Sequence, residues 1–243
     1  MKKVLSNLLG KAAEKGGARF TLSLIMPALA IALVLAASSA DAAGPPPGAL
    51  TDQDPAAYKG LTPQQIEALK KGGIVILDKP ENVEGRQMIT AAIIFNQDID
   101  TVWSLMTQGW RQEEYLPRLE RSTLFKKWDG GDQIEFQVSV LGIGISYRIL
   151  GTRDKSQYYS HWKLDPEFDN DMKEVSGYWR FYWIDDKHTL ARYGTWVQTG
   201  FGIPDFVQEY LTKKDLPNAL SAQKQWIDSG GTFRKEGYVP PEK

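Results

Sequence analysis

Apolar and polar residues alternate along residues 122–199, and this period of two predicts β-strands. Short clusters of Gly, Asp and Lys interrupt the alternation and have the composition of tight turns. The pattern predicts six strands, at residues 122–128, 133–140, 145–151, 157–164, 175–184 and 189–199. Two apolar runs nearer the N-terminus, 73–77 and 87–95, predict two further strands.

Two short helices are predicted before the six strands. The first covers residues 62–71, with Thr62 as its N-cap and Gln65 placed to close a capping box. The second follows the strand that ends at residue 95, and Asn96 is its expected cap. A further short segment, 112–119, contains Tyr and Leu residues that we expect to face inward.

A long amphipathic helix is predicted at residues 203–229. Its apolar residues recur close to the i, i+3, i+4, i+7 spacing of one helical face. Pro217 is expected to kink it, because proline lacks the amide hydrogen that an inner turn requires. The order of elements predicts an α+β helix-grip fold, a curved antiparallel sheet closed by a long C-terminal helix. Such an arrangement encloses an apolar interior, which favours a hydrophobic ligand.

Three stretches resemble the START-like (SRPBCC) superfamily, which includes StAR-related lipid-transfer, coenzyme Q-binding and polyketide cyclase-like proteins. They are the strand-to-helix passage 94–103, the late strand pair 177–181 and 189–193, and the closing helix with its segment 215–220. The resemblance extends over residues 73–229. It implies a helix-grip domain with an internal ligand cavity.

Residues 1–42 have the pattern of a secretory signal peptide. Five Lys and Arg residues precede an uncharged apolar run of 17 residues, 21–37, and Ala40-Asp41-Ala42 follows as a cleavage signal. We expect cleavage after Ala42 and a periplasmic or secreted protein. An uncleaved helix that anchors the protein in the inner membrane is the alternative, although this run is shorter than a span of roughly 20 residues.

The remaining chain divides into a Pro-rich tether at 43–60, a START-like domain at 61–230 with a short N-terminal helix, and a C-terminal tail at 231–243. Without the leader 201 residues remain, enough for one domain with a sizeable core. They contain 24 of the 29 Lys and Arg and 28 of the 30 Asp and Glu, a net charge of −4. This balance argues against nucleic acid as a partner. We expect a monomer.

Motifs for catalysis are sparse. The chain has no Cys, which excludes disulfides, a Cys nucleophile and Cys-ligated metal. It also lacks metalloprotease, P-loop and nucleophile-elbow motifs, so we expect no cofactor and no metal. His188 is predicted at a solvated turn and His161 as a half-exposed strand residue. We therefore expect a non-enzymatic protein. The alternative is an enzyme of the cyclase or aromatase type, against which secretion weighs.

Candidate ligand contacts come from the aromatic and apolar positions of the strands and the closing helix. In the strand 175–184, Trp179 and Phe181 share one face and Arg180 lies on the other. Arg180 and Arg192 would be a polar handle if they faced inward, where an unpaired charge is costly, and a surface pair if they faced outward. The predicted ligand-binding residues are Phe136, Val138, Val140, Tyr147, Trp162, Trp179, Arg180, Phe181, Arg192, Trp196, Phe206 and Tyr210.

The loop 140–145 is an uncharged apolar turn with two interpretations. It is either a buried hairpin tip or a lip at the cavity mouth that makes transient contact with a membrane. Together the features predict non-catalytic binding and transport of a hydrophobic small molecule, either a lipid, a sterol-like compound or an isoprenoid.

Overall fold

The structure is a computed structural model that describes residues 44–83, 85–200 and 204–240. The predicted signal peptide, residues 1–42, lies outside the described residues. So does residue 203, where the sequence predicts the start of the closing helix. Within the described residues no helix is long and apolar enough to cross a membrane.

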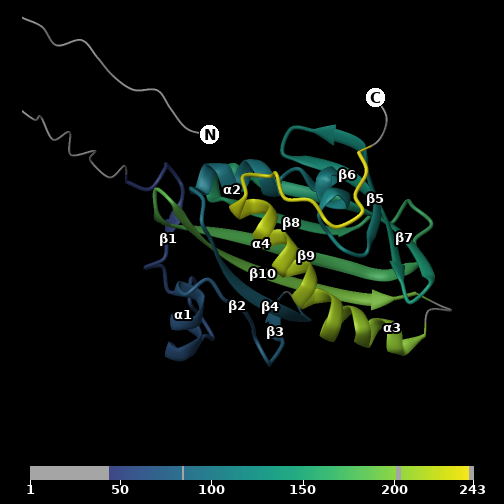
Figure 1. Ribbon diagram of the computed structural model, residues 1–243, viewed down its shortest axis with the longest axis horizontal. Helices are drawn as coiled ribbons and strands as arrows, with labels where there is room; N and C mark the ends of the chain where they lie inside the picture. Colours follow the sequence, from purple (N-terminus) through teal and green to yellow (C-terminus); the bar gives the residue numbers. More distant parts are fainter. Residues whose placement is uncertain (1–43, 84, 201–203, 241–243) are drawn as a thin grey trace, which may run out of the picture. The chain divides into compact units, whose positions relative to one another are not determined.

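One long antiparallel sheet forms the centre of the described chain (Figure 1). Its strands follow the order β2-β4-β10-β9-β8-β7-β6-β5, with β1 added in parallel to β9 and β3 paired with β4. The strands are β1 Leu50–Thr51, β2 Ile74–Ile76, β3 Glu81–Val83, β4 Arg86–Phe95, β5 Leu119–Trp128, β6 Gly131–Val140, β7 Ile143–Asp154, β8 Tyr159–Leu164, β9 Met172–Asp185 and β10 His188–Thr199. All eight predicted strands are present, and the α+β helix-grip fold is confirmed.

Short helices precede the meander and follow it. The helical elements are α1 Pro63–Lys70, α2 Ile99–Met106, a 3₁₀ helix Gly109–Glu114, a 3₁₀ turn Lys155–Gln157, α3 Asp205–Tyr210, a π-helical segment Leu211–Asp215 and α4 Leu216–Asp228. The predicted capping box of α1 is confirmed. The Thr62 hydroxyl accepts from the amide of Gln65 at 3.3 Å, and the Gln65 side chain accepts from the amide of Thr62 at 2.9 Å.

The predicted cap of α2 is wrong. Asp98 caps the helix, because its carboxylate accepts from the amides of Asp100 and Thr101 at 3.1 and 2.9 Å. Asn96 instead donates from its backbone and side-chain nitrogens to the carboxylate of Asp228, at 2.8 and 3.1 Å. Asn96 therefore joins the end of β4 to the end of α4, a role that depends on tertiary structure.

The closing helix is interrupted at Leu211–Asp215, where five residues adopt a π-helical turn. The interruption lies directly before Pro217, which has no amide hydrogen to continue a regular helix. α4 then crosses one face of the sheet (Figure 1). It buries Leu216, Leu220 and Trp226 among its apolar residues. Pro217 was predicted to kink the helix, and the structure instead has a change from π-helical to α-helical geometry just before it.

The two faces of the sheet have separate apolar clusters. On the inner face, α2 and α4 pack over strand residues such as Phe95 and Phe181. On the outer face, α1 and the segment before it pack over residues that alternate with these, such as Leu190 and Tyr182. The strands β4, β9 and β10 thus have apolar residues on both faces, because both faces of the sheet are covered.

The predicted tether at residues 43–60 differs from the structure. Leu50 and Thr51 form β1, paired with Tyr182 and Trp183 of β9, and Ala57 is fully buried. The apolar outer face of the sheet needs a cover, and this segment supplies it. Composition alone suggested flexibility because it does not reveal that tertiary partner.

The predicted C-terminal tail, residues 231–243, also makes specific contacts in its described part. The Lys235 amide donates to the carbonyl of Glu114 at 2.9 Å, and the Arg234 guanidinium lies 2.9 Å from the Glu114 carboxylate. Phe233 packs against the inner core cluster. The tail therefore fastens the 3₁₀ helix Gly109–Glu114 to the end of α4.

Candidate ligand-binding cavity

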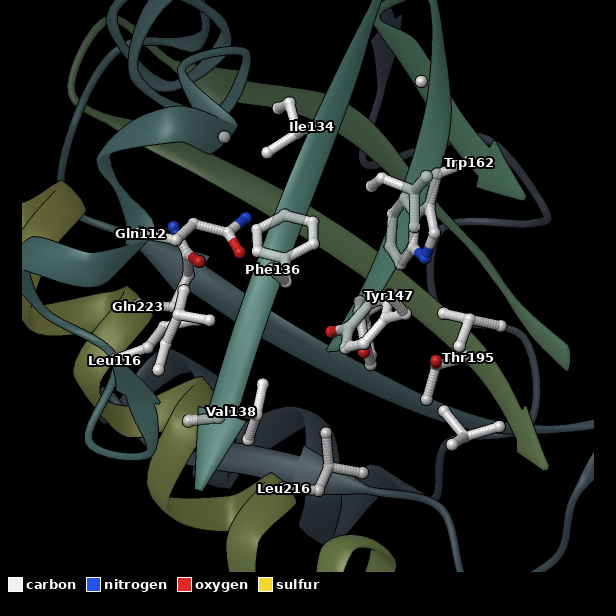
Figure 2. A pocket seen from close by; sticks show the side chains of 18 of the residues that line it. Gln112, Leu116, Ile134, Phe136, Val138, Tyr147, Trp162, Thr195, Leu216 and Gln223 are labelled. Carbon is white, nitrogen blue, oxygen red and sulfur yellow. The ribbon is translucent and has the colours of Figure 1, made fainter. Parts of the chain in front are cut away.

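A cavity of about 290 Å³ lies between the inner face of the sheet and the closing helix, and it is open to solvent on one side. Strands β6 to β10 form one wall, and the π-helical segment, α4 and the chain around the 3₁₀ helix form the other. The walls are mainly apolar, with Phe136, Val138, Trp162 and Leu216 turned toward the space (Figure 2). Ligand pockets usually measure about 300–1,000 Å³, so this volume suits a compact molecule.

The pleat of the strands decides which side chains reach the cavity. Phe136 on β6 and Tyr147 on β7 are register partners on the same face, and their ring centroids lie 5.4 Å apart. Trp162 on β8 and Tyr193 on β10 lie over the same space, with ring centroids 6.0 Å apart. An aromatic surface therefore extends across the five neighbouring strands β6 to β10, with Trp179 on β9, the strand between those of Trp162 and Tyr193.

Five predicted ligand contacts lie in the cavity wall: Phe136, Val138, Tyr147, Trp162 and Trp179. Two others face inward but lie in packed core away from the cavity. Phe181 is fully buried with the edge of its ring on Trp103 at 6.2 Å, and Val140 is fully buried in a cluster with Val207. At both positions a protein side chain occupies the space that a ligand would need.

The prediction that Arg180, Arg192 and Trp196 contact the ligand is wrong, because all three lie on the outer face. The Arg180 guanidinium lies over the ring of Tyr159 at 4.3 Å. Arg192 is buried and donates to the carbonyls of Ala57 and Lys59 at 3.3 and 2.8 Å. Adjacent strand residues point to opposite faces, so these side chains could not share the cavity with Trp179 and Tyr193.

Trp196 is held on the outer face by Glu174, whose carboxylate accepts from the indole nitrogen at 3.1 Å. Its neighbours in sequence, Thr195 and Val197, line the cavity instead. The alternation of side chains along a strand could have identified the lining residues of β10. Applied strictly, it selects Tyr193, Thr195 and Val197 in place of Arg192 and Trp196.

The predicted contacts from the closing helix also need correction. Phe206 is 54% exposed, whereas Val207, the next residue of α3, is fully buried. Neighbouring helix positions point about 100° apart, so a shift of one residue moves a side chain from solvent to core. Tyr210 lies outside the wall, but its hydroxyl accepts from Arg118 at 2.7 Å, and Arg118 is a lining residue. Tyr210 thus lies behind the rim of the cavity.

Several polar lining residues have no signal in the sequence. Asp132 and Arg153 form an ion pair in the wall, and a second pair joins Arg118 to Asp215 at 3.7 Å. Gln112 reaches the cavity from the 3₁₀ helix Gly109–Glu114 (Figure 2). They come from segments far apart in the chain, so only tertiary structure shows that they share one space.

Burial changes the acidity of the lining groups. It raises the pKa of the Tyr147 phenol, and it raises the pKa of Tyr193 to about 12. Burial also raises the pKa of the Asp215 carboxyl, with the Arg118 charge opposing the effect. Both phenols therefore keep their protons near neutral pH.

No protein-family model and no curated protein matches this sequence. Solved structures match in three dimensions. The STAR-related lipid transfer protein from Xanthomonas axonopodis has a TM-score of 0.53 at 14% identity, covering 63% of this chain and 92% of that chain. A START superfamily protein from Mycobacterium smegmatis has a TM-score of 0.50 at 12% identity, covering 58% of this chain and 97% of that chain. The fold is START-like.

The similar structures with a START-like fold include proteins described as enzymes. The Zhui aromatase/cyclase from a Streptomyces species matches with a TM-score of 0.49 at 14% identity, covering 59% of this chain and 92% of that chain. The START-like fold is established by the two likenesses with TM-scores of 0.50 and 0.53, and at their identities of 12% and 14% they establish nothing beyond the fold. The chemistry of the cavity must be argued from the residues of this chain.

His161 is among the residues around the cavity, whereas His188 is not. His161 has an exposed side chain whose ring lies 5.6 Å from that of Tyr159 on the outer face. His188 is exposed at the start of β10, with its Nδ1 2.8 Å from the Asp185 carboxylate. Both placements match the sequence-based interpretation. Within the described residues, no group of three or more His, Asp or Glu side chains could hold a metal ion.

Proposed function

We propose that this protein binds a compact hydrophobic small molecule in the cavity and carries it without chemical change. A lipid, a sterol-like compound or an isoprenoid is the ligand class that we favour. The observation that supports the proposal is the open, aromatic-lined cavity between sheet and closing helix. The fold likeness to a STAR-related lipid transfer protein supports it further.

Burial of the ligand would supply most of the affinity. Each 100 Å² of apolar surface removed from water contributes about 2.5 kcal/mol. Phe136, Trp162 and Trp179 offer flat apolar surfaces for such contact. A volume near the lower end of the usual range favours a single ring system or a short chain over a lipid with two long acyl chains.

The test is native mass spectrometry of the protein purified from its own envelope fraction, followed by organic extraction of what it holds. We expect one apolar molecule per chain. Ala219 lines the cavity on α4, so Ala219→Trp should fill the space and abolish co-purification. Ser221→Trp, at an exposed position of the same helix, should leave it unchanged. A wild-type protein that purifies without ligand and also fails to bind a panel of lipids and sterols would contradict the proposal.

An enzyme that uses the same cavity is the second candidate. The observation that favours it is the half-buried Asp215 carboxyl, whose pKa is raised by burial in a cavity that also contains the Tyr147 and Tyr193 phenols. A carboxyl of raised pKa beside proton donors is suited to general acid–base work. If this candidate holds, the molecule recovered from Asp215→Asn will differ in mass or structure from that recovered from the wild type. Identical molecules would favour a carrier.

A periplasmic or secreted location is the compartment that we propose for this carrier. The support is the pattern of residues 1–42 in the sequence, a basic lead, an apolar run and a cleavage signal. A hydrophobic ligand would need such a carrier to cross an aqueous compartment, because apolar molecules are poorly soluble in water.

A further inference from the structure

We infer that the ligand is a neutral molecule that presents a hydrogen-bond-accepting oxygen to the Tyr147 hydroxyl. The inference rests on the proposed function, since it specifies which apolar molecule the cavity binds. It excludes both pure hydrocarbons and fatty-acid anions as the best ligands. The argument has three steps: the state of Tyr147, the engagement of its polar neighbours and the charge balance of the wall.

Tyr147 lies between Ile145 and Ile149 on the inner face of β7, with the Phe136 ring beside it. Its side chain is enclosed, and within the described residues its hydroxyl has no hydrogen-bond partner. The hydroxyl oxygen lacks such a partner, but it does not belong to the fully buried side-chain atoms that lack one. It is therefore still accessible from outside the packed core. The accessible space beside it is the cavity, so the partner must come from the cavity contents.

The polar neighbours of Tyr147 are already engaged. Tyr193 is hydrogen-bonded to the Thr195 side chain, and Asp215 is paired with Arg118 at 3.7 Å. The Thr195 hydroxyl donates to the carbonyl of Ser176 at 3.3 Å. The Gln223 side chain accepts from Tyr115 at 3.0 Å and donates to the sulfur of Met106 at 2.9 Å. Tyr147 thus offers an unused donor within an apolar wall, and burial keeps the phenol protonated.

Gln112 is another lining side chain whose amide has no hydrogen bond within the described part of the chain. In Figure 2 it extends from the side of the cavity opposite Tyr147. The Gln112 side-chain amide can donate a hydrogen bond as well as accept one, so it could also bind an accepting oxygen of the ligand. Gln112 is therefore the rival anchor that the experiment must separate from Tyr147.

The charges in the wall favour a neutral ligand. Arg153 is paired with Asp132, and Arg118 with Asp215 at 3.7 Å, so the two arginines of the lining each face a carboxylate. A ligand carboxylate would have to enter beside these acids or displace one of them. An unpaired or repelled charge in an enclosed site is strongly unfavourable. A ketone, alcohol or ester oxygen incurs no such cost.

The experiment compares three probes of one rigid skeleton by calorimetry on the mature protein. Adamantan-2-one provides the acceptor oxygen, 2-methyleneadamantane replaces that oxygen with a CH₂ group of similar shape, and adamantane-1-carboxylate adds a charge. We expect the ketone to bind roughly three- to tenfold tighter than the methylene probe, the effect of one hydrogen bond. The carboxylate should bind more weakly than the ketone.

Two variants assign the anchor. In Tyr147→Phe the ketone and the methylene probe should bind within about twofold of each other, with the methylene probe unaffected. Its binding also shows that the variant is folded. In Gln112→Leu the preference for the ketone should persist.

Three outcomes overturn the inference while leaving the proposed function intact. They are equal binding of ketone and methylene probe by the wild type, a preference that survives Tyr147→Phe, and tightest binding of the carboxylate. Failure of all three probes to bind would instead contradict the proposed binding of compact apolar molecules.

Discussion

Two enclosed tyrosines differ in whether their hydroxyls have a partner. The Tyr115 hydroxyl donates to the Gln223 side chain at 3.0 Å, and its ring stacks on Trp226 with centroids 4.5 Å apart. The Tyr147 hydroxyl has no partner within the described residues. The same functional group should therefore contribute to folding at residue 115 and to ligand binding at residue 147.

Replacement of each tyrosine by phenylalanine tests this difference. Tyr115→Phe should lower the free energy of unfolding by about 1–3 kcal/mol, because it leaves the buried Gln223 acceptor unsatisfied. Tyr147→Phe should change it by less than about 0.5 kcal/mol, since the protein loses no internal hydrogen bond. Urea denaturation of the ligand-free proteins measures both, and equal losses would contradict this assignment.

The prediction of site residues succeeded where alternation within one strand was enough to show which side chains face the cavity. It failed where contact with a second element determined which face of the strand is enclosed. Phe136, Val138 and Tyr147 follow from alternation within β6 and β7. Arg192 was misplaced because its partners, the carbonyls of Ala57 and Lys59, belong to the segment predicted as a tether. The polarity of a side chain does not reveal which face is covered.

At the scale of elements, the hairpin between β6 and β7 and the helix α3 meet in one apolar cluster that contains Val140 and Val207. The loop has two residues, Leu141 and Gly142, with φ of 53° and 82°. Such turns normally use Asn-Gly, so a leucine with positive φ is conformationally costly. Its side chain is 55% exposed, and that of Phe206 on α3 is 54% exposed.

We propose that these exposed side chains make transient contact with a membrane, which is the second of the two interpretations of the loop 140–145. In sedimentation with phosphatidylethanolamine–phosphatidylglycerol vesicles, Leu141→Ser with Phe206→Ser should reduce the bound fraction at least about threefold, since each loses apolar contact with lipid. Phe125→Ser is the matched control, because Phe125 is 62% exposed on the edge strand β5. An equal loss with the control would show that general surface hydrophobicity is responsible.

At the scale of the whole molecule, both ends of the described chain pack on its centre. The segment from Ala57 to Leu61 covers the outer face of the sheet, and residues 233–235 contact the inner core and the 3₁₀ helix. The strand β1, Leu50–Thr51, follows the predicted cleavage position, so cleavage after Ala42 would leave every described element in the mature protein.

We expect the protein in its native envelope to begin at Ala43. Intact mass spectrometry should find a chain lighter than 27.3 kDa by the mass of residues 1–42. Replacement of Ala40 and Ala42 by bulky residues should retain the full-length mass, because the cleavage signal requires small side chains at both positions. A full-length wild-type chain in the membrane fraction would favour the uncleaved anchor.

Sequence alone determined the strands β4 to β10, the helices α1 and α2, and the helix-grip order. Each of these elements is long enough, or capped clearly enough, to leave a period or a cap signature in the chain. It also revealed the three-residue strand β2, which lies in the apolar run 73–77, but not β1 and β3, which are as short and have no such run. Tertiary structure decided which face of each strand is enclosed, how the π-helical segment turns Asp215 into the wall, and which polar groups are left without partners. Those properties depend on distances between residues that are far apart in the chain, which local patterns do not encode.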